Sequence, residues 1–160
     1  MKFIEQKQID ILNYRIQQEQ YSSKVYEQMS LFLQNESYIG MAKVWKKFAD
    51  EELEHANIAK DYLLSFDIMP ELMVIDEPIN TFTSPQDVIQ KTYDHECKIT
   101  EECLELSSKA MEWQDWTLFA LGQKYNEIQR IEMDEVNTLL DISKMTNDNL
   151  ILDHYISDNF

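Results

Sequence analysis

Apolar residues recur at steps of three and four positions along four long segments of this 160-residue chain. That spacing places them on one face of an α-helix, which is the pattern of a helix that packs against a core. A shorter apolar cluster follows a polar gap near the C-terminus. The pattern predicts four long helices and a short fifth, over residues 5–33, 38–65, 84–111, 115–142 and 148–157.

The segment between the second and third predicted helices, residues 67–83, contains Pro70 and Pro78 and has no helical period. A structureless connection of this length is uncommon in a compact domain. A 28-residue helix is about 42 Å long, and 17 extended residues reach about 56 Å. The segment can therefore cross the full length of a helical hairpin. We expect an all-α four-helix bundle with one long crossover.

The composition supports long helices. Only two glycines and three prolines interrupt the chain, which argues against a turn-rich β fold. A chain of this length forms one domain, predicted to span residues 1–160, with a substantial core. Cys97 and Cys103 fall on different faces of one predicted helix, so they cannot bridge each other.

The formal net charge is −16. It argues against nucleic acid or an anionic membrane as a partner and favours a protein that attracts cations. A nucleic-acid mimic that binds basic proteins is an alternative interpretation. Residues 1–6 show no leader pattern, and no apolar run approaches the length of a membrane span, so a cytoplasmic location is expected.

Side chains that bind metals recur at matched distances in the two halves of the chain. Glu19 is followed by Glu52 and then by His55, and the second half repeats both spacings with Glu96, Gln129 and Glu132. Every position is separated from its counterpart by the same interval. Residues equidistant from a turn lie at the same height in an antiparallel helix pair. The spacing therefore predicts turns near 35–36 and 112–113.

These side chains lie on the apolar stripes, where a carboxylate costs several kcal/mol unless it is paired or bound to a metal. One histidine cannot offset four buried carboxylates, so divalent cations are expected. A set rich in carboxylates with one imidazole suits iron or manganese, and zinc less specifically. We expect Glu52 to bridge two ions, with Glu19 and His55 on the first and Glu96 and Glu132 on the second. Gln129, a poor ligand, would hydrogen-bond a bound water or oxygen species.

The chain resembles the ferritins, specifically the bacterial non-haem ferritins with a heavy-chain-like ferroxidase subunit. The resemblance covers nearly the whole chain and rests on these ligands and on five segments, 21–23, 26–30, 51–55, 93–96 and 150–156. It implies a ferritin-like bundle and an iron-storage function. Fe²⁺ would be oxidised by O₂ or H₂O₂ at a di-iron site, and ferric mineral stored in a hollow homo-oligomer of about 24 subunits.

The resemblance also assigns roles to residues. The ferroxidase positions, both catalytic and metal-binding, are Glu19, Glu52, His55, Glu96, Gln129 and Glu132. Tyr26 occupies the position of a redox-active tyrosine, although an ordinary core residue explains it too. Leu53 replaces the methionine that binds haem in bacterioferritins, so no haem is expected. Ile128 and Ile131 replace two glutamates of a third iron site and argue against that site.

Two other functions remain open at this point. A small di-iron oxidase or peroxidase could act as a dimer without storing mineral. A structural helical bundle with a hydrogen-bonded polar layer would need no metal, but it leaves the buried acids unexplained. The apolar tail after residue 147 favours the shell, because a dimer has no evident need for it. His95 and His154 are expected to be structural and surface residues, respectively.

Overall fold

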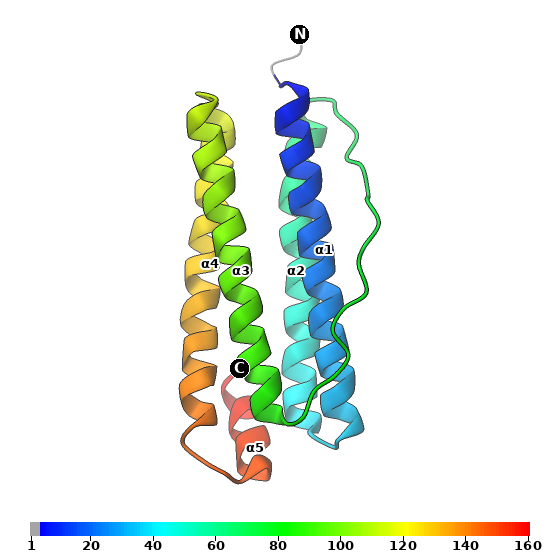
Figure 1. The fold of residues 1–160 in the computed structure, drawn as a ribbon, viewed down its shortest axis with the longest axis vertical. Helices are drawn as coiled ribbons and strands as arrows, with labels where there is room; N and C mark the ends of the chain where they lie inside the picture. The colour runs from blue at the N-terminus through cyan, green and yellow to red at the C-terminus, as the bar shows by residue number, and fades with distance from the viewer. Residues whose placement is uncertain (1–3) are drawn as a thin grey trace. The chain divides into compact units, whose positions relative to one another are not determined.

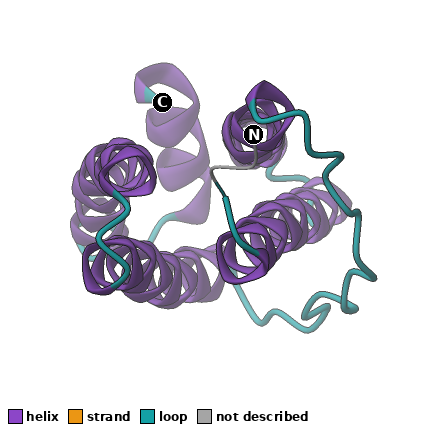
Figure 2. Ribbon diagram, turned by 90° about the horizontal axis from the view of Figure 1, so that it is seen from above, coloured by secondary structure: helices purple, strands orange, loops and turns teal. Residues whose placement is uncertain are grey.

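The computed structural model describes residues 4–160, so the expectation of no leader at residues 1–3 lies outside the described residues. The described chain folds into helices and loops without a strand (Figure 2). Its five helices are α1 (Gln6–Asn35), α2 (Ile39–Ser65), α3 (Pro85–Glu112), α4 (Trp116–Ser143) and α5 (Asn149–Asn159). The predicted all-α class with a short fifth helix is confirmed.

The helices form two compact units. The first runs as far as Phe82 and includes Asp153–Phe160, and the second is Thr83–Leu152. Each unit contains one helical pair, α1 with α2 and α3 with α4 (Figure 1). That residues 1–160 make a single domain stays a prediction.

Large apolar side chains fill the interior of each pair. Trp45 and Met41 of α2 and Leu12 and Ile16 of α1 are completely buried. Fully burying one such side chain stabilises a fold by about 1.5–3 kcal/mol. A corresponding buried set lies on α3 and α4, namely Val88, Ile89, Leu106, Ala110, Leu118, Tyr125 and Leu139. The stripes read from the sequence are therefore the packed faces of the two pairs.

The two hairpin turns have the same backbone structure. Ser37 and Gln114 adopt left-handed conformations with φ of 69° and 55°. Tyr38 N donates to Leu33 O at 2.8 Å, and at the equivalent place in the second hairpin Asp115 N donates to Ala110 O at 2.9 Å. This closure satisfies carbonyls that the ends of α1 and α3 would leave without partners. The internal repeat read from the ligands thus extends to the turns.

The connection after α2 runs along α1. Glu71 N donates to Asn13 Oδ1 at 3.0 Å, and Gln17 Nε2 donates to Val74 O at 2.6 Å. Further along, the rings of Phe82 and Phe32 lie 5.3 Å apart. The segment therefore advances in the same direction as α1 and ends beside its C-terminal part (Figure 1). The predicted crossover is confirmed.

Each of the two glycines lies inside a helix at a point where a second helix approaches its backbone closely. A Cβ on Gly40 would lie 2.7 Å from Ser157 Cβ, and one on Gly122 would lie 3.2 Å from Ser107 Cα. Neither glycine has a positive φ. Gly40 thus lets α5 approach the first turn of α2, and Gly122 lets α4 approach α3.

The fifth helix divides its apolar residues between two environments. Leu152 and Ile156 are fully buried, whereas Leu150, Ile151 and Tyr155 are 75%, 57% and 49% exposed. The sequence pattern identified the apolar tail but not which of its residues are buried. None of the helices within residues 4–160 is long and apolar enough to cross a bilayer.

Candidate metal centre

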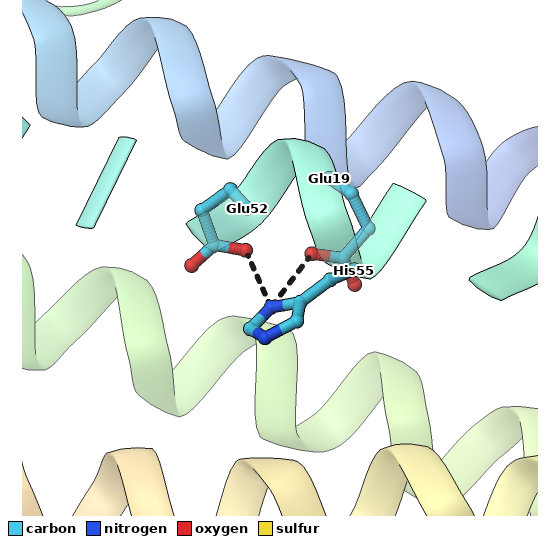
Figure 3. Close-up of side chains that lie close together, drawn as sticks. All are labelled: Glu19, Glu52 and His55. Carbon is cyan, nitrogen blue, oxygen red and sulfur yellow. Dashed lines mark hydrogen bonds and ion pairs between the residues drawn. The ribbon is translucent and has the colours of Figure 1, made fainter. Parts of the chain in front are cut away.

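The first helical pair brings three predicted ligands together. Glu19 comes from α1, and Glu52 and His55 lie one turn apart on α2. His55 Nδ1 lies 3.3 Å from Glu52 Oε2 and 3.9 Å from Glu19 Oε2, so one imidazole nitrogen faces both carboxylates (Figure 3). We call Glu19, Glu52 and His55 the first half-site.

The geometry of the first half-site fits a small cation. One ligand atom from each residue lies within 4.8 Å of the others. Ligands at about 2.0–2.2 Å from a shared ion lie at most about 4.4 Å apart, and the 3.3 and 3.9 Å distances from His55 Nδ1 fall within that limit. Glu19 Oε2 is buried and accepts no hydrogen bond from the described residues. Such an oxygen costs free energy unless something binds it, and a cation would do so.

Burial controls the charge of His55. Removal from water lowers the pKa of His55 below its ordinary 6.5, and nearby Arg15 lowers it further, while Glu19 and Glu51 oppose the change. The imidazole is therefore neutral near pH 7. A neutral imidazole has a free lone pair for a metal ion, so the environment prepares His55 as a ligand.

Arg15 is a component of this region that sequence reasoning missed. Its Nε lies 2.9 Å from Glu19 Oε1, and both side chains are buried, with exposed fractions of 3% and 2%. Removing one partner of a buried ion pair costs about 3–5 kcal/mol, because the other charge stays buried. The sequence held a signal: Arg15 is a lone cation on an apolar stripe, one helical turn before Glu19.

The second helical pair contains the other predicted ligands. Glu96 of α3 and Gln129 of α4 are both 3% exposed, and Glu132 is half-buried. Carboxylate oxygens of Glu96 and Glu132 lie within 4.8 Å of each other. We call Glu96, Gln129 and Glu132 the second half-site.

Gln129 holds Glu96 in place. Its Nε2 donates a short hydrogen bond to Glu96 Oε2 and a longer one, at 3.3 Å, to Glu96 O. The sequence predicted that this amide would contact a bound water or oxygen species. In the structure this amide donates to the buried Glu96 carboxylate, which stabilises its charge. The expected contact with a bound water or oxygen species stays a prediction.

Other predicted residues occupy simpler environments. Tyr26 is 1% exposed, and its ring meets Phe48 edge-on at 6.1 Å, so a hydrogen bond from its hydroxyl to the half-site stays a prediction. The side chain of His154 is 84% exposed and lies 3.8 Å from Asp158, as expected for a surface residue. The absence of a third iron site at Ile128 and Ile131 stays a prediction, as does the absence of haem at Leu53.

Comparisons with known proteins agree with this architecture. A profile of the ferritin-like domain family matches residues 9–145, so the chain belongs to that family. The bacterial non-heme ferritin of Escherichia coli is 32% identical over 133 residues, covering 83% of this chain and 81% of that protein. A probable bacterial non-heme ferritin-like protein of Haemophilus influenzae is equally similar over the same span.

Solved structures support the same conclusion. An open pore ferritin from Archaeoglobus fulgidus superposes with a TM-score of 0.93 at 25% identity, covering 98% of each chain. The fold is therefore the ferritin four-helix bundle with a short C-terminal helix. Membership of this family supports iron storage and iron oxidation as the general role of the chain.

Proposed function

We propose that this chain is a ferroxidase subunit that oxidises Fe²⁺ and stores the product as ferric mineral inside a homo-oligomeric shell. The observation that carries the proposal is the first half-site, in which Glu19, Glu52 and His55 converge in a buried setting. The internal repeat of ligands and turns supports a second half-site with a matching task. In the ferritin arrangement the two half-sites would face each other and hold two iron ions.

Each residue then has a distinct task toward the iron substrate. Glu19 and His55 bind the first Fe²⁺, and Glu96 and Glu132 bind the second. Glu52 presents two carboxylate oxygens, so we assign it as the ligand that both ions share. Gln129 fixes the orientation of Glu96. Imidazole and carboxylate ligands suit iron in both oxidation states.

The reaction requires one electron from each of two Fe²⁺ ions. With O₂ and two protons it yields two Fe³⁺ and one H₂O₂; with H₂O₂ and two protons it yields two Fe³⁺ and two waters. The net charge of −16 attracts Fe²⁺ to the protein, which supports delivery of the substrate. Tyr26, buried on the same helix as Glu19, is a candidate for supplying a further electron.

Replacement of Glu52 by Ala tests this function. Loss of the shared ligand should slow the oxidation of Fe²⁺ at least a hundredfold in stopped-flow absorbance, with the helical circular dichroism unchanged. Glu54→Ala is the matched control, because Glu54 is an exposed acid on the same helix. Wild-type rates in Glu52→Ala would refute the assignment.

The assembly is a separate part of the proposal. Leu150, Ile151 and Tyr155 expose apolar surface on α5 that a contact with other subunits would bury. A shell of about 24 subunits has a native mass about 24 times the chain mass of 19.1 kDa. Light scattering distinguishes this from a dimeric oxidase or peroxidase, the other function that the sequence allows.

Ile151→Lys tests the contact. It places a charge on the exposed face of α5 and leaves the buried Leu152 and Ile156 in place. We expect the native mass to fall. Removal of residues 147–160 should have the same effect. An unchanged mass in both variants would show that α5 takes no part in assembly.

A further inference from the structure

The two half-sites offset their buried carboxylates by different means. Glu19 is paired with the Arg15 guanidinium at 2.9 Å, whereas Glu96 accepts hydrogen bonds from the neutral amide of Gln129. The position equivalent to Arg15 in the second half of the chain is Thr92, whose hydroxyl donates to Val88 O at 2.8 Å. The second hairpin therefore folds in the same way without a cation at this position, so the hairpin as such does not require Arg15.

The ion pair also leaves the two oxygens of Glu19 in different situations. Oε1 lies 2.9 Å from Arg15 Nε in an ion pair, while Oε2 faces His55 Nδ1 at 3.9 Å and accepts no hydrogen bond from the described residues. The guanidinium is always charged, so this contact is an ion pair between two full charges at 2.9 Å, without the geometry of an aligned hydrogen bond from Nε. Only Oε2 of Glu19 is presented to an ion beside His55.

We infer that Arg15 is a positioning residue of the first half-site, which restricts Glu19 to one ligating oxygen and weakens the hold on the bound cation. This assignment rests on the proposed iron site. The fixed positive charge of Arg15 repels a cation held by Glu19, and solvent screens this repulsion poorly because the guanidinium is buried. The repulsion grows with the charge of the ion, so it acts more strongly on Fe³⁺ than on Fe²⁺. This repulsion therefore favours release of Fe³⁺ from the half-site toward storage.

Metal binding to Arg15→Gln tests this inference, with Zn²⁺ as a probe that undergoes no redox reaction. Calorimetry should show that the affinity of the tightest Zn²⁺ site is about tenfold higher in Arg15→Gln than in the wild type, because the repulsive charge is gone. The thermal midpoint should rise more on Zn²⁺ addition than it does in the wild type. Arg15→Lys, which keeps the charge, should bind Zn²⁺ within about threefold of the wild type.

The orientation of Glu19 has its own readout. The visible absorption of bound Co²⁺ reports coordination geometry, and it should change in both Arg15→Gln and Arg15→Lys, since neither side chain reproduces the guanidinium. If Arg15→Gln fails to fold, the spectrum of Arg15→Lys decides, and a spectrum identical to the wild type overturns the positioning role.

Arg130→Gln is the control, because Arg130 is the only other arginine. It is an exposed residue paired with Glu127 at 2.9 Å, so Zn²⁺ affinity should stay within twofold. Equal or weaker Zn²⁺ binding in a folded Arg15→Gln overturns the inference. Tight Zn²⁺ binding that survives in Glu52→Ala would instead overturn the proposed site itself, so the two failures are distinguishable.

Discussion

The carboxylate of Asp153 caps the N-terminus of α2 by accepting a hydrogen bond from Met41 N at 2.7 Å. Its second oxygen accepts from Gly40 N at 3.3 Å. Tyr38, the residue at the local capping position, contributes no side-chain cap, and the first turn of α2 has no acidic residue. The terminal helix thus supplies, from a distant part of the sequence, the negative charge and acceptors that a helix N-terminus requires.

Replacement of Asp153 by Ala should loosen the start of α2. The amides of Gly40 and Met41 would lose their acceptors, at a cost of about 1 kcal/mol. Hydrogen exchange at these two amides should accelerate about fivefold. Asp158→Ala is the control, because Asp158 is exposed and lies 3.8 Å from His154 in an ion pair. Equal exchange rates in the two variants would contradict the capping role.

Gly40→Ala should displace α5 from α2. The new Cβ would lie 2.7 Å from Ser157 Cβ and 2.9 Å from Asp153 O, so one of the helices must move. Overpacking of this kind costs about 1–3 kcal/mol. We expect faster hydrogen exchange throughout α5.

A second substitution examines the contact directly. Ser157→Gly in the Gly40→Ala background removes the closer of the two clashes and should restore part of the protection. No recovery at all would show that the two residues do not compete for space.

The stability of the metal-free protein should depend on His55. The pKa of His55 is lowered in the folded state, so below pH 6.5 the unfolded chain binds a proton that the folded chain does not. The contribution of the neutral His55 to the free energy of unfolding is fully present above pH 6.5, and it is lost as the pH falls through the pKa of His55 in the folded state. Urea unfolding in the presence of a chelator, between pH 7.5 and 5.5, should show a decline that His55→Gln reduces.

His154→Gln serves as the control for removal of an exposed imidazole. If His55→Gln and the wild type lose stability in parallel over this pH range, burial of a neutral His55 is wrong.

Gln129→Glu should make the second half-site dependent on metal. The new carboxylate would lie against Glu96 Oε2 in place of a donor, with both groups buried. An unsatisfied buried acceptor costs about 1–3 kcal/mol, and more when it is charged. The metal-free variant should therefore have a lower thermal midpoint, and Zn²⁺ should restore it.

Gln123→Glu makes the same change at an exposed position of α4 and should leave the midpoint nearly unchanged. A Gln129→Glu protein as stable as the wild type without metal would contradict the hydrogen bond to Glu96.

Local sequence patterns predicted most of the fold because the spacing of apolar residues and the ends of helices depend on residues that are close together in the sequence. At the start of α3, a serine followed by a proline is a local signal for a helix N-terminus, and Ser84 Oγ accepts from Asp87 N at 3.0 Å. Asp87 Oδ2 in turn accepts from Thr83 N, the amide of the residue before the cap. Glu19 and Glu52 could be identified as neighbours because residues equidistant from the turn of an antiparallel helix pair lie at the same height.

Features that depend on distant contacts could not be read in the same way. Asp153 looks like any polar residue of a short helix, and nothing near it in the sequence indicates that α2 lacks a cap of its own. The two faces of α5 also follow from packing, which buries Leu152 and exposes Leu150. Arg15 was missed for a different reason. A charged residue among the apolar positions of a helix is ordinarily interpreted as a break in the apolar pattern, not as part of a site.

We expect the two half-sites to hold two iron ions together. Crystals exposed to Fe²⁺ without oxygen, with anomalous diffraction recorded at the iron absorption edge, test this expectation most directly. We expect two peaks, one within bonding distance of Glu19, Glu52 and His55, and the other within bonding distance of Glu52, Glu96 and Glu132. Iron only at surface acids, or no peak near Glu52, would show that these residues do not form a di-iron site.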